Sequence, residues 1–248
     1  MSLFRFDKNN YVFNTSSKSG VYILHGFTST TYEVKDLAEF LGNNGYCTVA
    51  NNLPGHGTSI NDCNRIKYQH WIDKVKNDVA ELSSKCDKVF VIGNSMGGVL
   101  ALYLASLFPI NGFVAAGTVL KFNNHFTTNY IVPIICHFLP SRPKNKFNKS
   151  DSVKFYGYES YPLKALNQFK KMNNKIIPLI KKIKAPGMLI HSKSDGMSIK
   201  ENLDIIKRNV TKGNIKTFFV DKAHHNMFDK SPDQKLIFNE VLQFLNSH

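Results

Sequence analysis

The chain has 248 residues, of which 42% are hydrophobic and 20% are charged, and these values are typical of globular proteins. This length allows a single α/β unit with a large core that needs no disulfide or metal ion for stability. The net charge of +14 comes from lysines spread along the whole chain, so we predict no nucleic-acid partner and only weak, salt-dependent association with anionic lipid.

Short apolar runs alternate with amphipathic helical patterns along most of the chain. The expected strands occupy residues 20–25, 47–50, 88–93, 111–118, 187–191 and 216–220. The expected helices occupy residues 31–43, 71–86, 97–107, 199–209 and 232–246, and the third is apolar on nearly all sides. This alternation predicts an α/β fold, with a mostly parallel sheet and helices on both faces. Ligands of such sheets bind beyond the carboxyl ends of the strands, so chemistry is expected just after a strand.

Residues 121–182 interrupt the alternation. They mix Lys, Asn, Phe and scattered Pro residues, with helical patterns near residues 162–172 and 175–183. The segment is too long for a plain loop. We therefore predict a small cap at residues 121–182, inserted into a core formed by residues 1–120 and 183–248.

The strongest chemical signal is the pentapeptide Gly93-Asn94-Ser95-Met96-Gly97. It follows an apolar strand and precedes an apolar helix, which is the context that a G-x-S-x-G motif requires. The turn between strand and helix is so sharp that its flanking residues must be small. Ser95 is therefore the candidate nucleophile, and the helix N-terminus beneath it favours developing negative charge.

A serine hydroxyl needs a general base at neutral pH, and the expected chain order is Ser, then an acid, then His. Asp195 follows the strand at residues 187–191 and is the preferred acid. Its competitors are less well placed, because Asp204 lies inside a predicted helix and Asp221 follows the next strand. His224 and His225 both follow the last strand, and only one of them can face Ser95. The residue pattern leaves this choice open.

An oxyanion would need two backbone N–H groups. Met96, directly after the nucleophile, is expected to supply one, and Phe27 in the loop after an early strand the other. His25, two residues before Phe27, is expected to be structural. The remaining histidines and the four cysteines show no metal-ligand spacing, and no nucleotide-binding glycine motif is present. No metal or other cofactor is therefore predicted.

Four stretches resemble a known family, the bacterial carboxylesterase and monoacylglycerol-lipase branch of the α/β-hydrolases. The family's oxyanion segment is resembled by VYILHGFTST, and its P-G-H-G loop by NNLPGHGTS. Its nucleophile elbow is resembled by VIGNSMGGVLAL, and its acid loop by IKAPGMLIHSKSDGM. The resemblance implies the α/β-hydrolase fold and ester hydrolysis through an acyl-enzyme. Residues 223–228 resemble the family's A-x-H-x-x-F pattern, and this likeness places the catalytic histidine on His225.

The resemblance thus implies a serine carboxylesterase that acts on small-molecule esters. The length of the acyl chain does not follow from the resemblance, because the cap lies outside the matching stretches, and the short-to-medium acyl chains that we predict follow from the apolar cap described below. Monoacylglycerol lipase and thioesterase are close alternatives, and an acyltransferase or a non-catalytic binding protein are more distant ones. A haloalkane dehalogenase would need Asp where Ser95 stands.

The sequence also predicts a location. It has no apolar leader and no run of 18 apolar residues, and its cysteines form no recognisable pairing pattern, so we predict a cytoplasmic location.

The cap is expected to form the acyl pocket over Ser95, because ligand sites are mostly apolar. Its apolar side chains are numerous and alternate with Lys-rich stretches. They are Phe122, Phe126, Tyr130, Ile131, Ile134, Ile135, Phe138 and Leu139.

Overall fold

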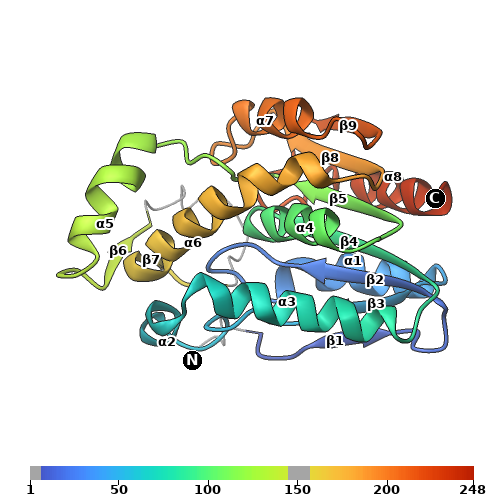
Figure 1. Cartoon of the computed structure of the whole chain (residues 1–248). Helices are drawn as coiled ribbons and strands as arrows, with labels where there is room; N and C mark the ends of the chain where they lie inside the picture. The colour runs from blue at the N-terminus through green and yellow to red at the C-terminus, as the bar shows by residue number, and fades with distance from the viewer. Residues whose placement is uncertain (1–6, 145–156) are drawn as a thin grey trace.

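The computed structural model describes residues 7–144 and 157–248, and a seven-stranded sheet lies at its centre (Figure 1). The strand order is β1-β3-β2-β4-β5-β8-β9, and every pairing is parallel except that of β1 with β3. The prediction of a mostly parallel sheet is confirmed. The strands are β1 (Tyr11–Phe13), β2 (Ser19–Leu24), β3 (Cys47–Ala50), β4 (Lys88–Asn94), β5 (Gly112–Ala116), β8 (Gly187–Ser192) and β9 (Ile215–Val220).

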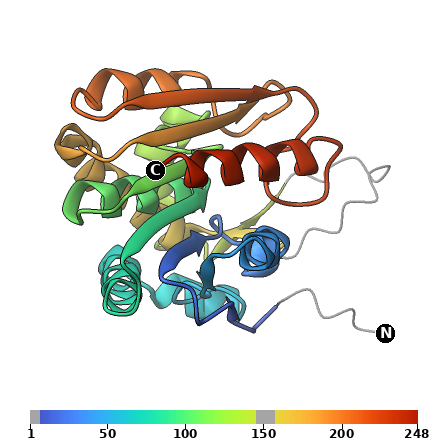
Figure 2. The same cartoon turned by 90° about the vertical axis from the view of Figure 1, so that its right-hand side faces the viewer.

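Helices cover both faces of the sheet, as predicted (Figure 2). On one face lie α1 (Tyr32–Asn43) and α8 (Gln234–Asn246). On the other face lie α3 (Tyr68–Ser83), α4 (Met96–Leu107), α6 (Leu163–Ile176) and α7 (Glu201–Asn209). None of the described helices combines the length and apolarity needed to cross a bilayer.

The side chains of β4 show why the sheet needs both layers. Val89 and Val91 belong to the buried cluster beneath α3 and α4, whereas Phe90 and Ile92 belong to the cluster beneath α1 and α8. Successive strand residues point to opposite faces of a sheet. A strand that is apolar at every position must therefore be covered on both sides.

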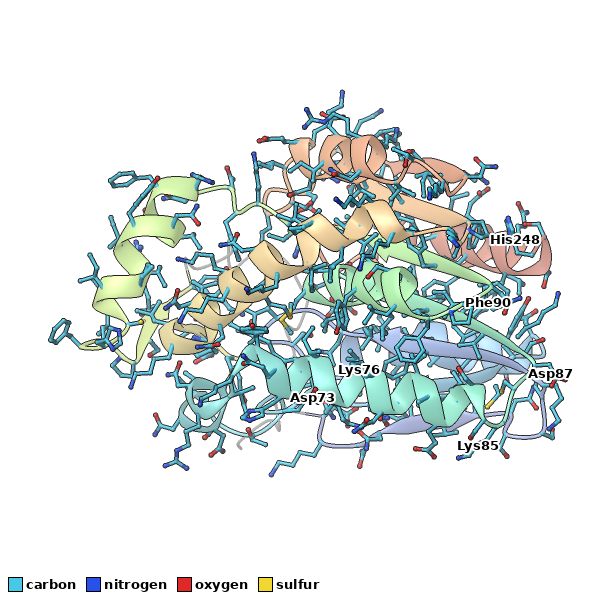
Figure 3. All side chains as sticks on the ribbon, viewed as in Figure 1. Asp73, Lys76, Lys85, Asp87, Phe90 and His248 are labelled. Atoms are coloured by element: carbon cyan, nitrogen blue, oxygen red, sulfur yellow. The ribbon has the colours of Figure 1, made fainter. Side chains whose placement is uncertain are left out.

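The two helices that flank β4 differ in how much of their surface is buried. In α3, Trp71, Val75 and Val79 are fully buried, while Asp73 and Lys76 face solvent (Figure 3). In α4 nine of the twelve residues are buried, which explains why its sequence is apolar on nearly all sides. This buried helix begins at Met96, the residue after the candidate nucleophile Ser95.

The segment predicted as a cap consists of short elements and one long helix. The short elements are a π-helical turn (Thr127–Ile131), α5 (Val132–Ile135) and the hairpin strands β6 (Ser141–Pro143) and β7 (Ser160–Pro162). The two helical patterns near 162–183 form one continuous run, α6 followed by a 3-10 turn (Ile177–Lys182). Buried side chains of this run belong to the same cluster as α3 and α4. In Figure 1, α5, β6 and β7 lie at the left, beyond the ends of the strands of the central sheet.

The proposed cap boundaries at residues 121 and 182 stay a prediction, and residues 145–156 lie outside the described part of the chain. Several short elements have no counterpart in the sequence analysis. They are β1, α2 (Ile60–Arg65), the π-helical turn with α5, and the β6–β7 hairpin. Elements of three to six residues are too short to display a hydrophobic period.

Candidate active site

Ser95 stands in the turn between β4 and α4 with φ 54° and ψ −113°. A positive φ is unfavourable for a residue with a side chain and persists where the surrounding structure enforces it. Two glycines let the backbone segments around Ser95 approach each other closely. A Cβ on Gly93 would lie 2.1 Å from the Gly97 carbonyl carbon, and a Cβ on Gly97 would lie 2.3 Å from the Leu24 carbonyl oxygen. The turn therefore has no room for a side chain at position 93 or 97.

Gly97→Ala is expected to lower the free energy of unfolding by about 3 kcal/mol or more, because the new methyl group would overlap the β2 backbone. Gly196→Ala serves as the control, since a Cβ there meets nothing within 4 Å. Urea unfolding followed by the fluorescence of Trp71, the single tryptophan, measures both variants. Equal unfolding midpoints for the two variants would contradict the close contact.

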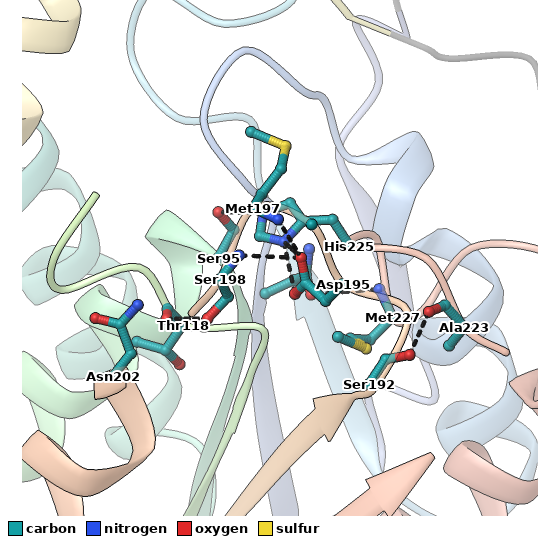
Figure 4. Close-up of polar contacts among 12 residues, drawn as sticks. Ser95, Thr118, Ser192, Asp195, Met197, Ser198, Asn202, Ala223, His225 and Met227 are labelled. Atoms are coloured by element: carbon teal, nitrogen blue, oxygen red, sulfur yellow. Dashed lines mark hydrogen bonds and ion pairs between the residues drawn. The ribbon is translucent and has the colours of Figure 1, made fainter. Parts of the chain in front are cut away.

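Three of the sequence-predicted residues form one hydrogen-bonded chain (Figure 4). Ser95 Oγ lies 2.9 Å from His225 Nε2, and His225 Nδ1 lies 3.0 and 2.9 Å from the two carboxylate oxygens of Asp195. Ser95 follows β4, and Asp195 and His225 lie in the loops after β8 and β9. The chain therefore lies at the carboxyl ends of the parallel strands, where ligands of such sheets bind.

The rejected candidates lie elsewhere. The side chains of His224, Asp204 and Asp221 are all exposed, and Asp204 lies in α7. Asp221 forms an exposed ion pair with Lys193, with Oδ1 and Nζ 2.8 Å apart. Each of these three side chains is therefore at the surface and outside the hydrogen-bonded chain of Ser95, His225 and Asp195.

Asp195 has a fully buried side chain, whereas 14% of the His225 side chain is exposed. Burial by itself raises the pKa of Asp195, but the hydrogen bond and charge of His225 hold that pKa below its ordinary value, with help from the backbone N–H groups of Ser198 and Met197. Asp195 is thus ionised at neutral pH. An ionised carboxylate at Nδ1 keeps the proton on that nitrogen and leaves Nε2 able to accept the Ser95 proton.

The loop that carries His225 is fixed by contacts that the sequence analysis did not identify. The hydroxyl of Ser192, at the end of β8, donates a hydrogen bond to the Ala223 carbonyl oxygen, with the two oxygens 2.5 Å apart. The Asp233 carboxylate accepts the backbone N–H groups of Lys222 and Ala223 at 2.6 and 2.9 Å. Because these partners are far apart in sequence, no local pattern marks them.

The two candidate oxyanion donors lie on segments that meet beside Ser95. Met96 is the first residue of α4, and the N–H groups of a helix's first turn lack acceptors within the helix. Phe27 follows Gly26, where a Cβ would lie 3.3 Å from Ser95 Cβ. The next residue, Thr28, has φ 64°, which is a strained value for a β-branched residue.

His25 secures the start of this segment. Its Nδ1 donates to the Gly26 carbonyl oxygen at 2.9 Å, and its Nε2 accepts the Leu53 N–H at 3.0 Å. Burial lowers the pKa of His25 to about 4, so the ring is neutral at physiological pH. His25 thus joins two loops and has no ring nitrogen left for chemistry.

An aromatic group lies against Phe27. The Phe27 ring centroid is 5.5 Å from that of Phe169 in α6 and 6.3 Å from that of Trp71 in α3. Phe122 packs edge-on against Phe169 with centroids 5.1 Å apart. This aromatic group (Phe27, Trp71, Phe122 and Phe169) packs the segment of the candidate donor Phe27 onto α3 and α6, where Trp71 and Phe169 are buried.

The acyl pocket expected from the cap's apolar residues stays a prediction, and four of those eight residues are largely exposed. Phe126, Tyr130, Ile134 and Phe138 are between 61% and 86% exposed. They lie just before, within and just after the run formed by the π-helical turn and α5. A hydrophobic sequence indicates that a side chain favours burial, but it does not say against which surface.

The described residues, 7–144 and 157–248, contain no group of three or more His, Cys, Asp or Glu side chains arranged to hold a metal ion. The four cysteines are free thiols, and each is buried.

Comparisons with known proteins agree with this architecture. The family described as serine aminopeptidase, S33, matches residues 15–231. A thermostable monoacylglycerol lipase of Bacillus sp. strain H-257 is 29% identical over 233 residues, which cover 92% of this chain and 91% of the lipase. A carboxylesterase of Bacillus subtilis strain 168 is 23% identical over 91% of each chain.

Two solved structures show that the fold is also shared. One, from work on the metagenome-derived lipolytic enzymes LipS and LipT, aligns with a TM-score of 0.87 at 22% identity, covering 97% of this chain and 98% of the other. The monoacylglycerol lipase of Paleococcus ferrophilus aligns with a TM-score of 0.78 at 19% identity, covering 98% and 99%. At these identities the likeness concerns the fold alone.

Proposed function

The chain belongs to the serine aminopeptidase S33 family of α/β-hydrolases, and from this premise we propose that it is a serine carboxylesterase. The observation that carries the proposal is the hydrogen-bonded chain from Ser95 through His225 to Asp195. It brings together a nucleophile, a base and an orienting acid, the set that acyl transfer through an acyl-enzyme requires. No cofactor takes part in this chemistry.

In the proposed reaction, Ser95 Oγ attacks the ester carbonyl carbon while His225 Nε2 takes the hydroxyl proton. The carbonyl oxygen becomes negative and accepts the N–H groups of Phe27 and Met96. The imidazolium of His225 then protonates the departing alcohol, which leaves an ester on Ser95. Water, deprotonated by His225, hydrolyses that ester and restores the enzyme. Asp195 holds the imidazole in its tautomer and stabilises its charged form throughout.

The relatives support an ester substrate, since the two full-length ones described above are a monoacylglycerol lipase and a carboxylesterase. We favour short-to-medium acyl esters, with the acyl chain against the aromatic group. A monoacylglycerol lipase is the second candidate, because the Bacillus lipase matches almost the whole chain. Substrate tests separate the carboxylesterase and the monoacylglycerol lipase from four other possibilities. These are a thioesterase, a peptidase of the kind that the family description names, an acyltransferase and a non-catalytic binding protein.

We expect kcat/KM for p-nitrophenyl esters to rise from acetate toward medium chains, by up to about fourfold per methylene. This corresponds to roughly 0.8 kcal/mol for each buried methylene that is also held in the transition state. In Phe169→Ala, kcat/KM should increase less with acyl-chain length, because the substitution removes one ring of the aromatic group. The measurement is kcat/KM from acetate to palmitate, together with a monoacylglycerol and an aminoacyl p-nitroanilide. A steady fall from acetate onward would exclude an acyl site there.

A cytoplasmic location and weak association with anionic lipid also stay predictions. The exposed apolar side chains of α5 and its neighbours would add to any such association. Sedimentation with anionic vesicles at low and high salt tests it, since an electrostatic contact weakens as salt rises.

A further inference from the structure

Glu33 is a buried carboxylate that the proposed mechanism does not use. It lies in the first turn of α1, and only 3% of the residue is exposed. Its two oxygens accept hydrogen bonds from different segments: Oε2 from the Gly26 backbone N–H at 2.8 Å, and Oε1 from the Asn94 side-chain amide. Gly26 precedes Phe27, and Asn94 precedes Ser95. Glu33 therefore joins the two segments that carry the candidate oxyanion donors.

The orientation of the Asn94 amide follows from its other partner. The Met227 backbone N–H donates to Asn94 Oδ1 at 3.4 Å, so the amide nitrogen is the atom that faces Glu33. Met227 lies two residues after His225. One series of hydrogen bonds thus runs from Gly26 through Glu33 and Asn94 to the loop of the base.

The carboxylate is separated from the nucleophile by a single glycine. A Cβ on Gly26 would lie 3.3 Å from Glu33 Oε2 and 3.3 Å from Ser95 Cβ. Burial raises the pKa of Glu33, and the opposing influences come from Gly26, Ser29, the charge of His225 and Asn94. A buried carboxylate is unfavourable unless it is hydrogen-bonded. The partners named here all lie in segments beside the site.

We propose that Glu33 is a positioning residue, whose carboxylate holds the Phe27 segment against the Ser95 turn at the spacing that an oxyanion requires. This inference rests on the proposed esterase function. The strain at Thr28 gives the Phe27 segment a reason to need such support, since strained backbone persists only where its surroundings enforce it. Small displacements of catalytic groups have large effects on rate.

Glu33→Gln is the first test. A glutamine side chain has one acceptor oxygen and one NH2 group, so it must present a donor to one of the two N–H partners. We expect kcat to fall about 10- to 100-fold, with KM nearly unchanged, because the oxyanion donors act on the transition state. Glu39→Gln is the matched control: the same change in the same helix at an exposed position, with kcat expected to stay the same.

Asn94→Asp supplies a rescue experiment. Alone, it places two carboxylates against each other and should also lower kcat. In the double variant Glu33→Gln and Asn94→Asp, the glutamine can accept from Gly26 and donate to Asp at position 94, which still accepts from Met227. All hydrogen bonds of the series are then restored with one donor and acceptor exchanged. We expect the double variant to regain at least tenfold in kcat over either single variant.

Thermal unfolding of all variants separates positioning from stability. Loss of kcat in Glu33→Gln at an unchanged or higher Tm, followed by recovery in the double variant, supports the proposal. Wild-type kcat in Glu33→Gln overturns it, and so does a double variant no faster than its slower parent.

A fluorophosphonate probe keeps this test independent of the natural substrate. Its reaction with Ser95 also places an oxygen among the Phe27 and Met96 donors, so labelling of Glu33→Gln should be slower than that of the wild type. If the wild type is labelled but hydrolyses no ester, the proposed function fails while the role of Glu33 is decided by the labelling rates. If the wild type is not labelled at all, both proposals fail.

Discussion

Ser95→Ala is expected to abolish ester hydrolysis, with a loss in kcat on the order of 10⁶, because no acyl-enzyme can form without the hydroxyl. The fold should persist. Alanine keeps the Cβ and therefore the same backbone preference as serine at φ 54°, and the side-chain hydrogen bond that is lost is the one to His225. The measurement is hydrolysis of p-nitrophenyl esters, with thermal unfolding as the check on folding.

Ser106→Ala provides the matched control for this variant. Ser106 lies in the same helix, α4, and its hydroxyl donates only to the Tyr103 carbonyl oxygen at 2.7 Å. We expect its activity to equal that of the wild type and its labelling by a fluorophosphonate probe to be complete. Complete labelling of Ser95→Ala would instead show that the nucleophile lies elsewhere in the chain.

His225→Ala is expected to lower kcat by about four to six orders of magnitude, since members of such a set act as a unit. The variant leaves Ser95 Oγ without its acceptor and Asp195 without the ring that holds its pKa down. The adjacent His224→Ala offers an unusually close comparison, because it makes the same change one residue earlier on an exposed side chain. We expect it to alter kcat less than twofold.

The comparison of the two histidines has a clear contrary outcome. If His224→Ala were the slower enzyme, the base would be His224 and the hydrogen bond between His225 and Ser95 would have another role. Measurement of kcat under saturating substrate for both variants decides between them.

Local sequence was sufficient for the features that depend on short-range physics. The apolar run at residues 88–93 marks a strand buried on both faces, and the glycines at 93 and 97 mark a turn without room for side chains. Ser95 and Asp195 were indicated by their positions just after predicted strands, whereas the choice of His225 over His224 rested on the family resemblance. The prediction of an α/β-hydrolase fold rested on the same alternation and on the family resemblance, and it is confirmed.

The sequence could not decide which surface each apolar segment meets. Phe126 and Phe169 both lie in the predicted cap and are equally hydrophobic, but Phe126 faces solvent and Phe169 is buried against the core. Burial depends on where a helix is placed relative to the sheet, and that placement results from the packing of the whole chain.

Long-range polar contacts were equally hidden in the sequence. Glu33 lies in the helix expected at residues 31–43, and no motif marks it. Its carboxylate accepts a hydrogen bond from Asn94, 61 positions away, and Asn94 accepts one from Met227, 133 positions further on. Periodicity and motif spacing record only neighbours along the chain. Contacts between distant segments form when β2, β4 and the loop after β9 are brought to one edge of the sheet, so only the tertiary structure determined them.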